Sequence, residues 1–280
     1  MRVISLTTIP PRFEAVGSTL KSLVDQVGQI DEIHLYVPKR YRRFPDYGGE
    51  LPSVPAGVTI VRPEDDLGPA SKVLFAARSL RGRDAQILFC DDDRLYRHDW
   101  AATLFDAQSE RPNECVALFG KDLRVDFERP RQPRAIRDKS KLDYRLKRFK
   151  HGLASILTTK AIPAPGRIVV SSAGYADVLM GFGGAVVRPH FFDDSAFNIP
   201  DILWTVDDYW LSGLLAAKGI GIWLPAGLER PGWTDANELD ALLDATIDGA
   251  GRSEANTRCV QYMQDNLGVW RQQAAEVVSS

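Results

Sequence analysis

Several features that mark particular classes of protein are absent from this 280-residue chain. Its three cysteines, Cys90, Cys115 and Cys259, are far apart and form no C-x-x-C pair, which excludes a disulfide framework and a cysteine-based zinc cluster. No run of 18 apolar residues occurs, and the apolar stretch at the N-terminus is too short for a signal peptide. We therefore expect a soluble protein of a reducing compartment, the cytoplasm.

The chain also lacks a charge excess of either sign. Its net charge of -2 gives no overall attraction to nucleic acid or to acidic lipid. Internal repeats and low-complexity tracts are absent, and the contents of hydrophobic (44%) and charged (26%) residues are typical of a globular protein. The length allows one large α/β domain or two small ones, with a sizeable core.

The most informative feature present is a run of three aspartates, Asp91, Asp92 and Asp93, directly after the apolar stretch 85–90. Three ionised carboxylates at the end of a buried strand repel one another unless a cation lies among them. Their oxygens suit Mg²⁺ or Mn²⁺. In an extended segment Asp91 and Asp93 point to one side, and Asp92 points away, toward a sugar or a basic side chain. The alternative is a solvated acidic loop.

The order of apolar patterns predicts an α/β fold. Strands are expected at 2–8, 33–37, 58–61, 85–90, 115–119 and 221–224, and helices at 13–27, 70–80, 99–109, 205–218 and near the C-terminus. This alternation favours an open, mostly parallel sheet covered by helices. Ligands of such sheets bind beyond the carboxyl ends of the strands, which is where the aspartate triplet would lie.

A second acidic pair, Asp207-Asp208, opens the helix predicted at 205–218. One interpretation is structural, because Thr205 and Asp208 have the spacing of a capping box and acidic residues favour the first turn of a helix. The other is chemical, because a carboxylate at this position could act as a general base toward an acceptor hydroxyl. The position of the pair relative to Asp93 decides between them.

Four further segments are weaker candidates. The loop 7–12 follows the first strand, and the turn 67–69 opens a helix in which Lys72 could meet a phosphate, although capping and a surface lysine are the alternatives. The turn 181–184 has three glycines and permits close backbone approach. Segment 121–150 carries twelve Lys or Arg against five Asp or Glu, and is a solvated loop, a mobile lid or a basic patch.

In their order along the chain, the segments 5–12, 67–72, 91–93, 181–184 and 207–211 resemble a GT-A fold glycosyltransferase, family-2-like, with a D-x-D motif, of the kind found in polysaccharide biosynthesis. The resemblance implies a single α/β domain with a mostly parallel central sheet flanked by helices. Residues 1–120 would form a Rossmann-like half that binds a nucleotide sugar. Residues 121–150 would be a basic loop or lid, and residues 151–280 the acceptor-side half with C-terminal helices.

The resemblance also implies an activity: metal-dependent transfer of a sugar from a nucleotide-diphosphate sugar to a hydroxyl of a glycan or lipid-linked acceptor, with inversion. Asp91 and Asp93 would hold Mn²⁺ or Mg²⁺, and Asp208 or its neighbour Asp207 would be the catalytic base; glutamate is frequent at the position of Asp207, which leaves that choice open. The residues expected at the donor are Thr7, Thr8, Pro10, Arg12, Asp66, Lys72, Asp91 and Asp92. Those expected at the substrate are Gly183, Gly184 and Trp210.

Other activities stay open. A phosphohydrolase of the haloacid dehalogenase kind would use the first aspartate as nucleophile, but its motif follows the first strand and has Thr or Val where Leu95 stands here. A sugar-nucleotide pyrophosphorylase would need a glycine-rich basic loop after the first strand, which is missing. A module that binds carbohydrate or a divalent cation gives Asp207-Asp208 no role beyond capping. Peripheral contact with the inner face of the membrane, retention of anomeric configuration and oligomeric state are left undecided by the sequence.

Overall fold

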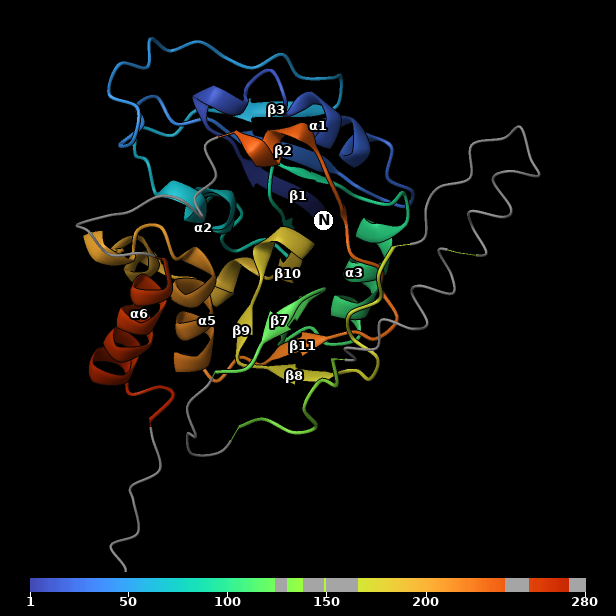
Figure 1. Ribbon diagram of the computed structural model, residues 1–280, viewed down its shortest axis with the longest axis vertical. Helices are drawn as coiled ribbons and strands as arrows, with labels where there is room; N and C mark the ends of the chain where they lie inside the picture. The colour runs from blue at the N-terminus through green and yellow to red at the C-terminus, as the bar shows by residue number, and fades with distance from the viewer. Residues whose placement is uncertain (124–129, 138–148, 150–165, 240–251, 272–280) are drawn as a thin grey trace, which may run out of the picture.

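The computed structural model describes residues 1–123, 130–137, 149, 166–239 and 252–271 (Figure 1). Its central sheet has eight strands in the order β3-β2-β1-β4-β10-β6-β11-β8. These strands are β1 (Arg2–Thr7), β2 (Glu32–Tyr36), β3 (Val58–Val61), β4 (Gln86–Phe89), β6 (Cys115–Ala117), β8 (Gly174–Ala176), β10 (Ala185–Val187) and β11 (Ile222–Leu224). The helices are α1 (Gly17–Val24), α2 (Ser71–Ser79), α3 (Trp100–Ser109), α5 (Asp207–Ala217) and α6 (Arg252–Leu267).

The predicted α/β class with a large, mostly parallel sheet is confirmed. Strands β3, β2, β1 and β4 run parallel to one another, and β6 runs parallel to β11. Strand β10 is antiparallel to both β4 and β6, and β8 is antiparallel to β11. Two small sheets pair β5 (Arg94–Leu95) with β12 (Gly232–Trp233) and β7 (Gly120–Lys121) with β9 (Val178–Leu179).

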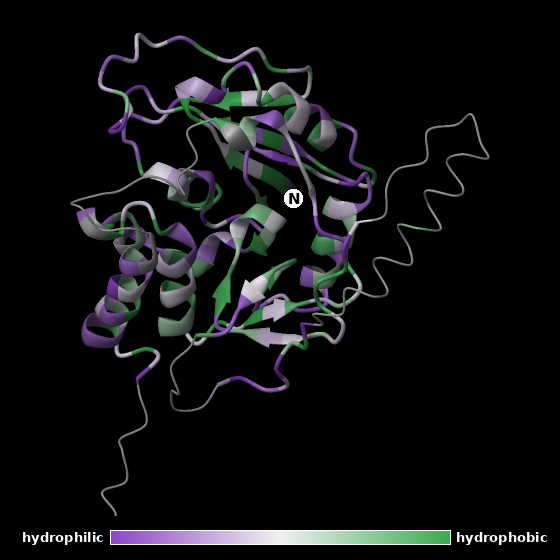
Figure 2. Cartoon of the chain, viewed as in Figure 1, coloured by the Kyte–Doolittle hydropathy of each residue, from purple (hydrophilic) through white to green (hydrophobic). Residues whose placement is uncertain are grey.

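Alternating side chains of the strands form a separate core on each face of the sheet. Val3, Ile87 and Phe89 pack on one face with α2, α5 and α6, whereas Ile4 and Leu88 pack on the other with α1 and α3. Figure 1 shows the same division, with α2, α5 and α6 on one side and α1 and α3 on the other. The strands of the central sheet are mostly apolar, whereas the outer helix α6 is largely polar, as Figure 2 shows. Such runs are expected of strands that are buried on both faces.

Helix α1 is shorter than the segment 13–27 that was predicted for it. Residues Pro10–Arg12 form a 3₁₀ turn, and α1 begins only at Gly17. At the other end Val27 is 49% exposed and its backbone N–H donates to the carbonyl of His98, so it no longer belongs to the helix. The apolar spacing of Phe13 and Val27 therefore does not mark helix, since Phe13 packs on the core from the turn before α1 and Val27 lies largely exposed after the helix.

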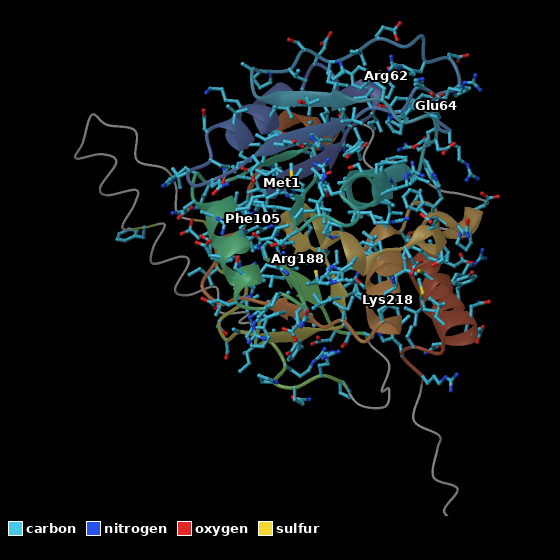
Figure 3. All side chains as sticks on the ribbon, turned by 180° about the vertical axis from the view of Figure 1, so that it is seen from behind. Met1, Arg62, Glu64, Phe105, Arg188 and Lys218 are labelled. Atoms are coloured by element: carbon cyan, nitrogen blue, oxygen red, sulfur yellow. The ribbon has the colours of Figure 1, made fainter. Side chains whose placement is uncertain are left out.

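The N-terminus of the chain lies near the C-terminal end of β10. Met1, Phe105 and Arg188 lie close together in the view from behind (Figure 3). The Met1 amino group donates to the carbonyl of Asp84, and Arg188 Nη1 lies 2.5 Å from the carboxylate of the same residue. These contacts fix the start of β1 against β4 and β10.

The basic stretch predicted at 121–150 is described only in part, since residues 124–129, 138–148 and 150 lie outside the described residues. In the part that the structure describes, Arg134 pairs with Asp122 and, at 2.7 Å, with the buried Asp177, and Arg137 also pairs with Asp122. These arginines therefore neutralise local carboxylates. Among the described residues there is no helix of the length and apolarity that a membrane crossing requires.

Candidate active site

A cavity of about 540 Å³ lies beyond the carboxyl ends of β1 and β4. The loops after these two strands form part of its wall, together with the segments that open α2 and α5. Of the residues predicted from the sequence, those that line it are Thr7, Thr8, Arg12, Asp66, Lys72, Asp91, Asp92, Asp93, Asp207 and Asp208. The two acidic groups, 116 positions apart when counted from Asp91 to Asp207, thus share one cavity.

Each aspartate of the triplet has a basic partner from the chain itself. Lys72 Nζ lies 2.6 Å from Asp91 Oδ1, and Arg12 Nη1 lies 2.6 Å from Asp92 Oδ1. Asp92 and Asp93 are buried, which shows that the alternative of a solvated acidic loop is wrong. The repulsion that the sequence predicted is therefore relieved by internal cations.

The pKa values of the three carboxyl groups shift in different directions. Burial, aided by the neighbouring carboxylates, raises the pKa of Asp93 to about 6. Burial also raises the pKa of Asp92, against the opposing effect of Arg12. Burial acts in the same sense on Asp91, but the Lys72 ammonium outweighs it and lowers the pKa of that carboxyl. The triplet therefore holds its firmest negative charge at Asp91, next to Lys72.

Lys72 joins the two acidic groups. Its Nζ lies 2.6 Å from Asp91 Oδ1 and 2.9 Å from Asp207 Oδ2, and the side chain is 95% buried. Burial opposes the charge on Lys72, but the carboxylates of Asp207 and Asp91 raise its pKa well above the ordinary value. This burial shows that the alternative of a surface lysine is wrong, while the contact of Lys72 with a phosphate stays a prediction.

In the second acidic pair, Asp208 is held by the turn 181–184. Its Oδ1 accepts a hydrogen bond of 2.9 Å from the backbone N–H of Gly181. Burial, together with the charge of Asp207, raises the pKa of Asp208 to about 7. A carboxyl group with this pKa exchanges protons readily near neutral pH.

The capping box expected at this helix does not form. The N-cap of α5 is Val206 rather than Thr205, and no side chain caps the helix. The Asp208 carboxylate is turned to Gly181 instead, because the turn 181–184 brings a free N–H to it. The capping-box interpretation of Asp207-Asp208 is therefore wrong, whereas both residues do lie in the first turn of α5, where acidic side chains favour the helix dipole.

The predicted substrate residues Gly183 and Gly184 lie beside the cavity and do not line it. A Cβ at Gly183 would lie 2.3 Å from the Phe119 ring, and one at Gly184, where φ is +92°, would lie 2.3 Å from the Trp100 ring. The indole of Trp100 also donates to the carbonyl of Gly183 at 2.8 Å. These glycines are therefore explained by close packing of two aromatic rings.

Two other predicted residues also lie away from the cavity wall. Trp210 is buried in the core, where its indole N–H donates to the carbonyl of Ala196 at 3.0 Å. Pro10 sits in the 3₁₀ turn after β1 and is not part of the lining. The ring of Trp210 thus serves packing between α5 and its neighbours.

Sequence reasoning missed several lining residues, of which Arg94 and Arg230 are the most unusual. Arg94 directly follows the triplet, and its guanidinium lies between the rings of Phe182 and Trp233. The only signal was a basic residue at the end of an acidic run. Its stacking partners could not be predicted, because they lie about 90 and 140 positions further along the chain.

A divalent cation could be held by Asp91 and Asp93. The buried Oδ1 of Asp93 makes no hydrogen bond among the described residues, although Arg94 Nε lies 3.2 Å from it. In the same part of the chain, no group of three or more His, Cys, Asp or Glu side chains is arranged around a metal position. Since Mg²⁺ usually completes its shell with water and substrate phosphates, two carboxylates fit such an ion when a diphosphate is bound.

Comparisons with known proteins find structural likeness only. The chain matches no protein-family profile, and no curated protein sequence is similar to it. Among solved structures, TarS from S. aureus is similar: residues 1–349 with UDP-GlcNAc give a TM-score of 0.49 at 15% identity, covering 94% of this chain and 65% of that one. The same TarS fragment with UDP gives a TM-score of 0.43 at 13% identity, and the match covers 94% of this chain and 72% of the fragment.

A further crystal structure of S. aureus TarS gives a TM-score of 0.43 at 14% identity, and the match covers 85% of this chain. This chain spans 37% of the length of that TarS chain. The α/β class, the cavity and the joined acidic groups are established by the structure of this chain alone.

Proposed function

We propose that the protein is a glycosyltransferase that moves a sugar from a nucleotide-diphosphate sugar to a hydroxyl of a glycan or lipid-linked acceptor, with inversion at the anomeric carbon. One observation carries the proposal. The triplet at the end of β4 and the Asp207-Asp208 pair at the start of α5 meet in one cavity and are joined through Lys72. Transfer of a glycosyl group needs two such regions, one for the leaving group and one for a proton.

Asp208 is the base in this proposal. Its carboxylate takes the proton of the acceptor hydroxyl as the oxygen attacks the anomeric carbon, and the bond from that carbon to the donor phosphate breaks in the same step. The pKa near 7 lets the group accept this proton at neutral pH. The hydrogen bond from Gly181 fixes one oxygen of Asp208 and leaves the other to face the acceptor.

The donor side consists of the triplet and its cations. The leaving diphosphate gains negative charge as the glycosyl bond breaks, and Asp91 and Asp93 would hold the Mg²⁺ or Mn²⁺ ion that stabilises this charge. Lys72 keeps Asp91 and Asp207 in place by pairing with both. Arg12 and Thr8 fix Asp92, each with a polar atom 2.6 Å from its carboxylate.

The proposal is tested with a panel of UDP-, GDP-, CMP- and dTDP-sugars, UDP-GlcNAc among them. One donor is expected to raise the melting temperature, and to do so only when Mn²⁺ or Mg²⁺ is present. If no nucleotide sugar binds in the presence of metal, the proposed transferase activity is wrong. Release of inorganic phosphate from simple phosphomonoesters would favour the hydrolase instead, and donor binding without transfer to any acceptor would favour a binding module.

A further inference from the structure

The mouth of the cavity holds an unusual stack of charged and aromatic side chains. Strands β5 and β12 pair so that Trp233 stands opposite Arg94. The Arg94 guanidinium carbon lies 3.1 Å from the centre of the Trp233 ring and 4.7 Å from that of Phe182. Arg230 approaches the same two rings, at 5.4 and 5.2 Å. Two guanidinium groups of like charge are thus held side by side by two rings.

These arginines have hydrogen-bond donors that the described part of the chain does not satisfy. Arg94 is 95% buried, yet its Nε and Nη1 have no hydrogen-bond partner there, and neither has Nε of Arg230. Asp93 Oδ1 lies 3.2 Å from Arg94 Nε but is itself without a hydrogen bond. Arg12 also approaches Asp93, at 3.8 Å. A buried charge with unmade hydrogen bonds is costly, and an oxyanion at the more exposed guanidinium edge of Arg230 would offset the positive charge that only Asp93 pairs with in the described part of the chain.

The stack also offers an apolar face beside its charge. Trp233 is 48% exposed, although it lines the cavity. A diphosphate has no apolar face to cover an indole, whereas a sugar ring can lay its C–H face on it. The combination of an exposed indole and two arginines therefore matches a sugar that carries an acidic group.

We propose that Arg94, Arg230 and Trp233 form a subsite for an acidic sugar unit of the acceptor, bearing a carboxylate or a phosphate. The inference rests on the proposed transferase function and names its acceptor class. The acidic group meets the guanidinium edges, and the sugar ring stacks on the indole.

The test uses three sugars as probes: methyl β-glucuronide, glucose 6-phosphate and the neutral methyl β-glucoside. Their dissociation constants are measured by NMR titration of the full chain. At least one acidic probe is expected to bind about tenfold more tightly than the neutral one, the gain typical of one hydrogen bond between charged groups. The acidic probe that binds more tightly shows whether the subsite prefers a carboxylate or a phosphate. Equal binding of all three probes would overturn the inference.

Substitutions at the three residues test whether the preference for an acidic sugar arises at the proposed subsite. Arg230→Gln and Arg94→Lys are expected to lose the preference for acidic over neutral probes, since glutamine is uncharged and lysine lacks the planar fork of donors. Trp233→Ala is expected to weaken the binding of acidic and neutral probes to the same extent. Arg81→Gln is the matched control, because Arg81 pairs with Asp194 outside the cavity lining. Melting temperatures show whether each variant is folded, and the half-buried Arg230 gives a second variant if Arg94→Lys fails to fold.

The nucleotide-sugar affinity separates this inference from the proposed function. Arg230→Gln is expected to bind the donor as the wild type does. A tenfold loss of donor affinity would assign the arginines to the donor diphosphate and would overturn the acceptor subsite. If the wild type binds no nucleotide sugar, the proposed transferase function is wrong, whether or not an acidic probe binds.

Discussion

The two walls of the cavity treat their charges differently. On the inner wall, Lys72 lies within 2.9 Å of two carboxylates, and Arg12 within 2.6 Å of a third. At the mouth, Arg94 and Arg230 retain buried donors with no hydrogen bond from the described chain. Short ion pairs therefore hold the charges of the inner wall, which suits the catalytic groups of the proposed function, whereas the arginines at the mouth are less fully paired and suit ligand binding.

The largest expected effect is the loss of stability when the central cation of the inner wall, Lys72, is removed. Lys72→Met leaves Asp91 and Asp207 without the ammonium between them, and loss of one partner from a buried ion pair costs about 3–5 kcal/mol. Urea denaturation at pH 7.5 measures this loss. Lys39→Met is the control, because Lys39 pairs with Glu64 on the surface, where such pairs contribute little. A loss of stability no greater than in the control would contradict the central role of Lys72.

The division of labour between the two acidic groups is tested by their substitutions. Asp208→Asn should lower kcat by about 10²- to 10⁴-fold, the usual contribution of a general base, while donor affinity is kept. Asp93→Ala should lose both donor binding and transfer. Single-turnover rates and donor titrations separate the two effects. Equal donor affinity in Asp93→Ala and wild type would refute the assignment of Asp93 to the metal.

The pH dependence of both rate and stability should report Asp208. Its base form increases as pH rises through about 7, so the transfer rate should rise over the same range. Stability should change in the opposite direction. The folded chain holds this proton up to about pH 7, whereas the unfolded chain releases it near 3.8, so the free energy of unfolding falls between these values as pH rises.

Asp208→Asn provides the check on this assignment. The variant should have a shallower fall in the free energy of unfolding between pH 4 and 7, because one of the contributing groups is gone. Asp93, whose pKa is raised to about 6, contributes a smaller fall in the lower part of the range. An unchanged slope in Asp208→Asn would mean that another group causes the dependence.

The smallest effect is expected away from both walls. Trp210→Phe removes the hydrogen bond to the carbonyl of Ala196 and should cost about 1–3 kcal/mol of stability, since a buried acceptor loses its donor. The KM for donor and acceptor should stay as in the wild type, because the ring lies outside the cavity lining. A marked rise in either KM would return Trp210 to the substrate site that the resemblance assigned to it.

Local patterns were sufficient to predict the α/β class, the strands β1 to β4 and the place of the triplet at the edge of the sheet. Apolar runs and proline breaks are properties of neighbouring residues, and they are legible in the sequence. The insertion of β10 between β4 and β6 was not predicted, because it depends on pairing between residues about 100 positions apart.

The chemistry of the site was harder to predict than its position. The aspartates could be recognised as needing cations, but not that Lys72, Arg12 and Arg94 supply them. Likewise, the glycines at 183 and 184 suggested a ligand, whereas the rings of Phe119 and Trp100 require them. Such partners are set by tertiary packing, for which a single sequence carries no local signal.

The pairing of β5 with β12 has a thermodynamic consequence. The N–H of Thr234 donates to the carbonyl of Asp93 at 3.1 Å, so the strand that carries Trp233 is tied to the backbone of the triplet. We expect a ligand that shifts Trp233 to shift Asp93 as well, so that acceptor and donor do not bind independently. Linkage then requires each substrate to change the affinity of the other by the same factor. Titrating methyl β-glucuronide with and without nucleotide sugar, and the reverse, measures that factor twice.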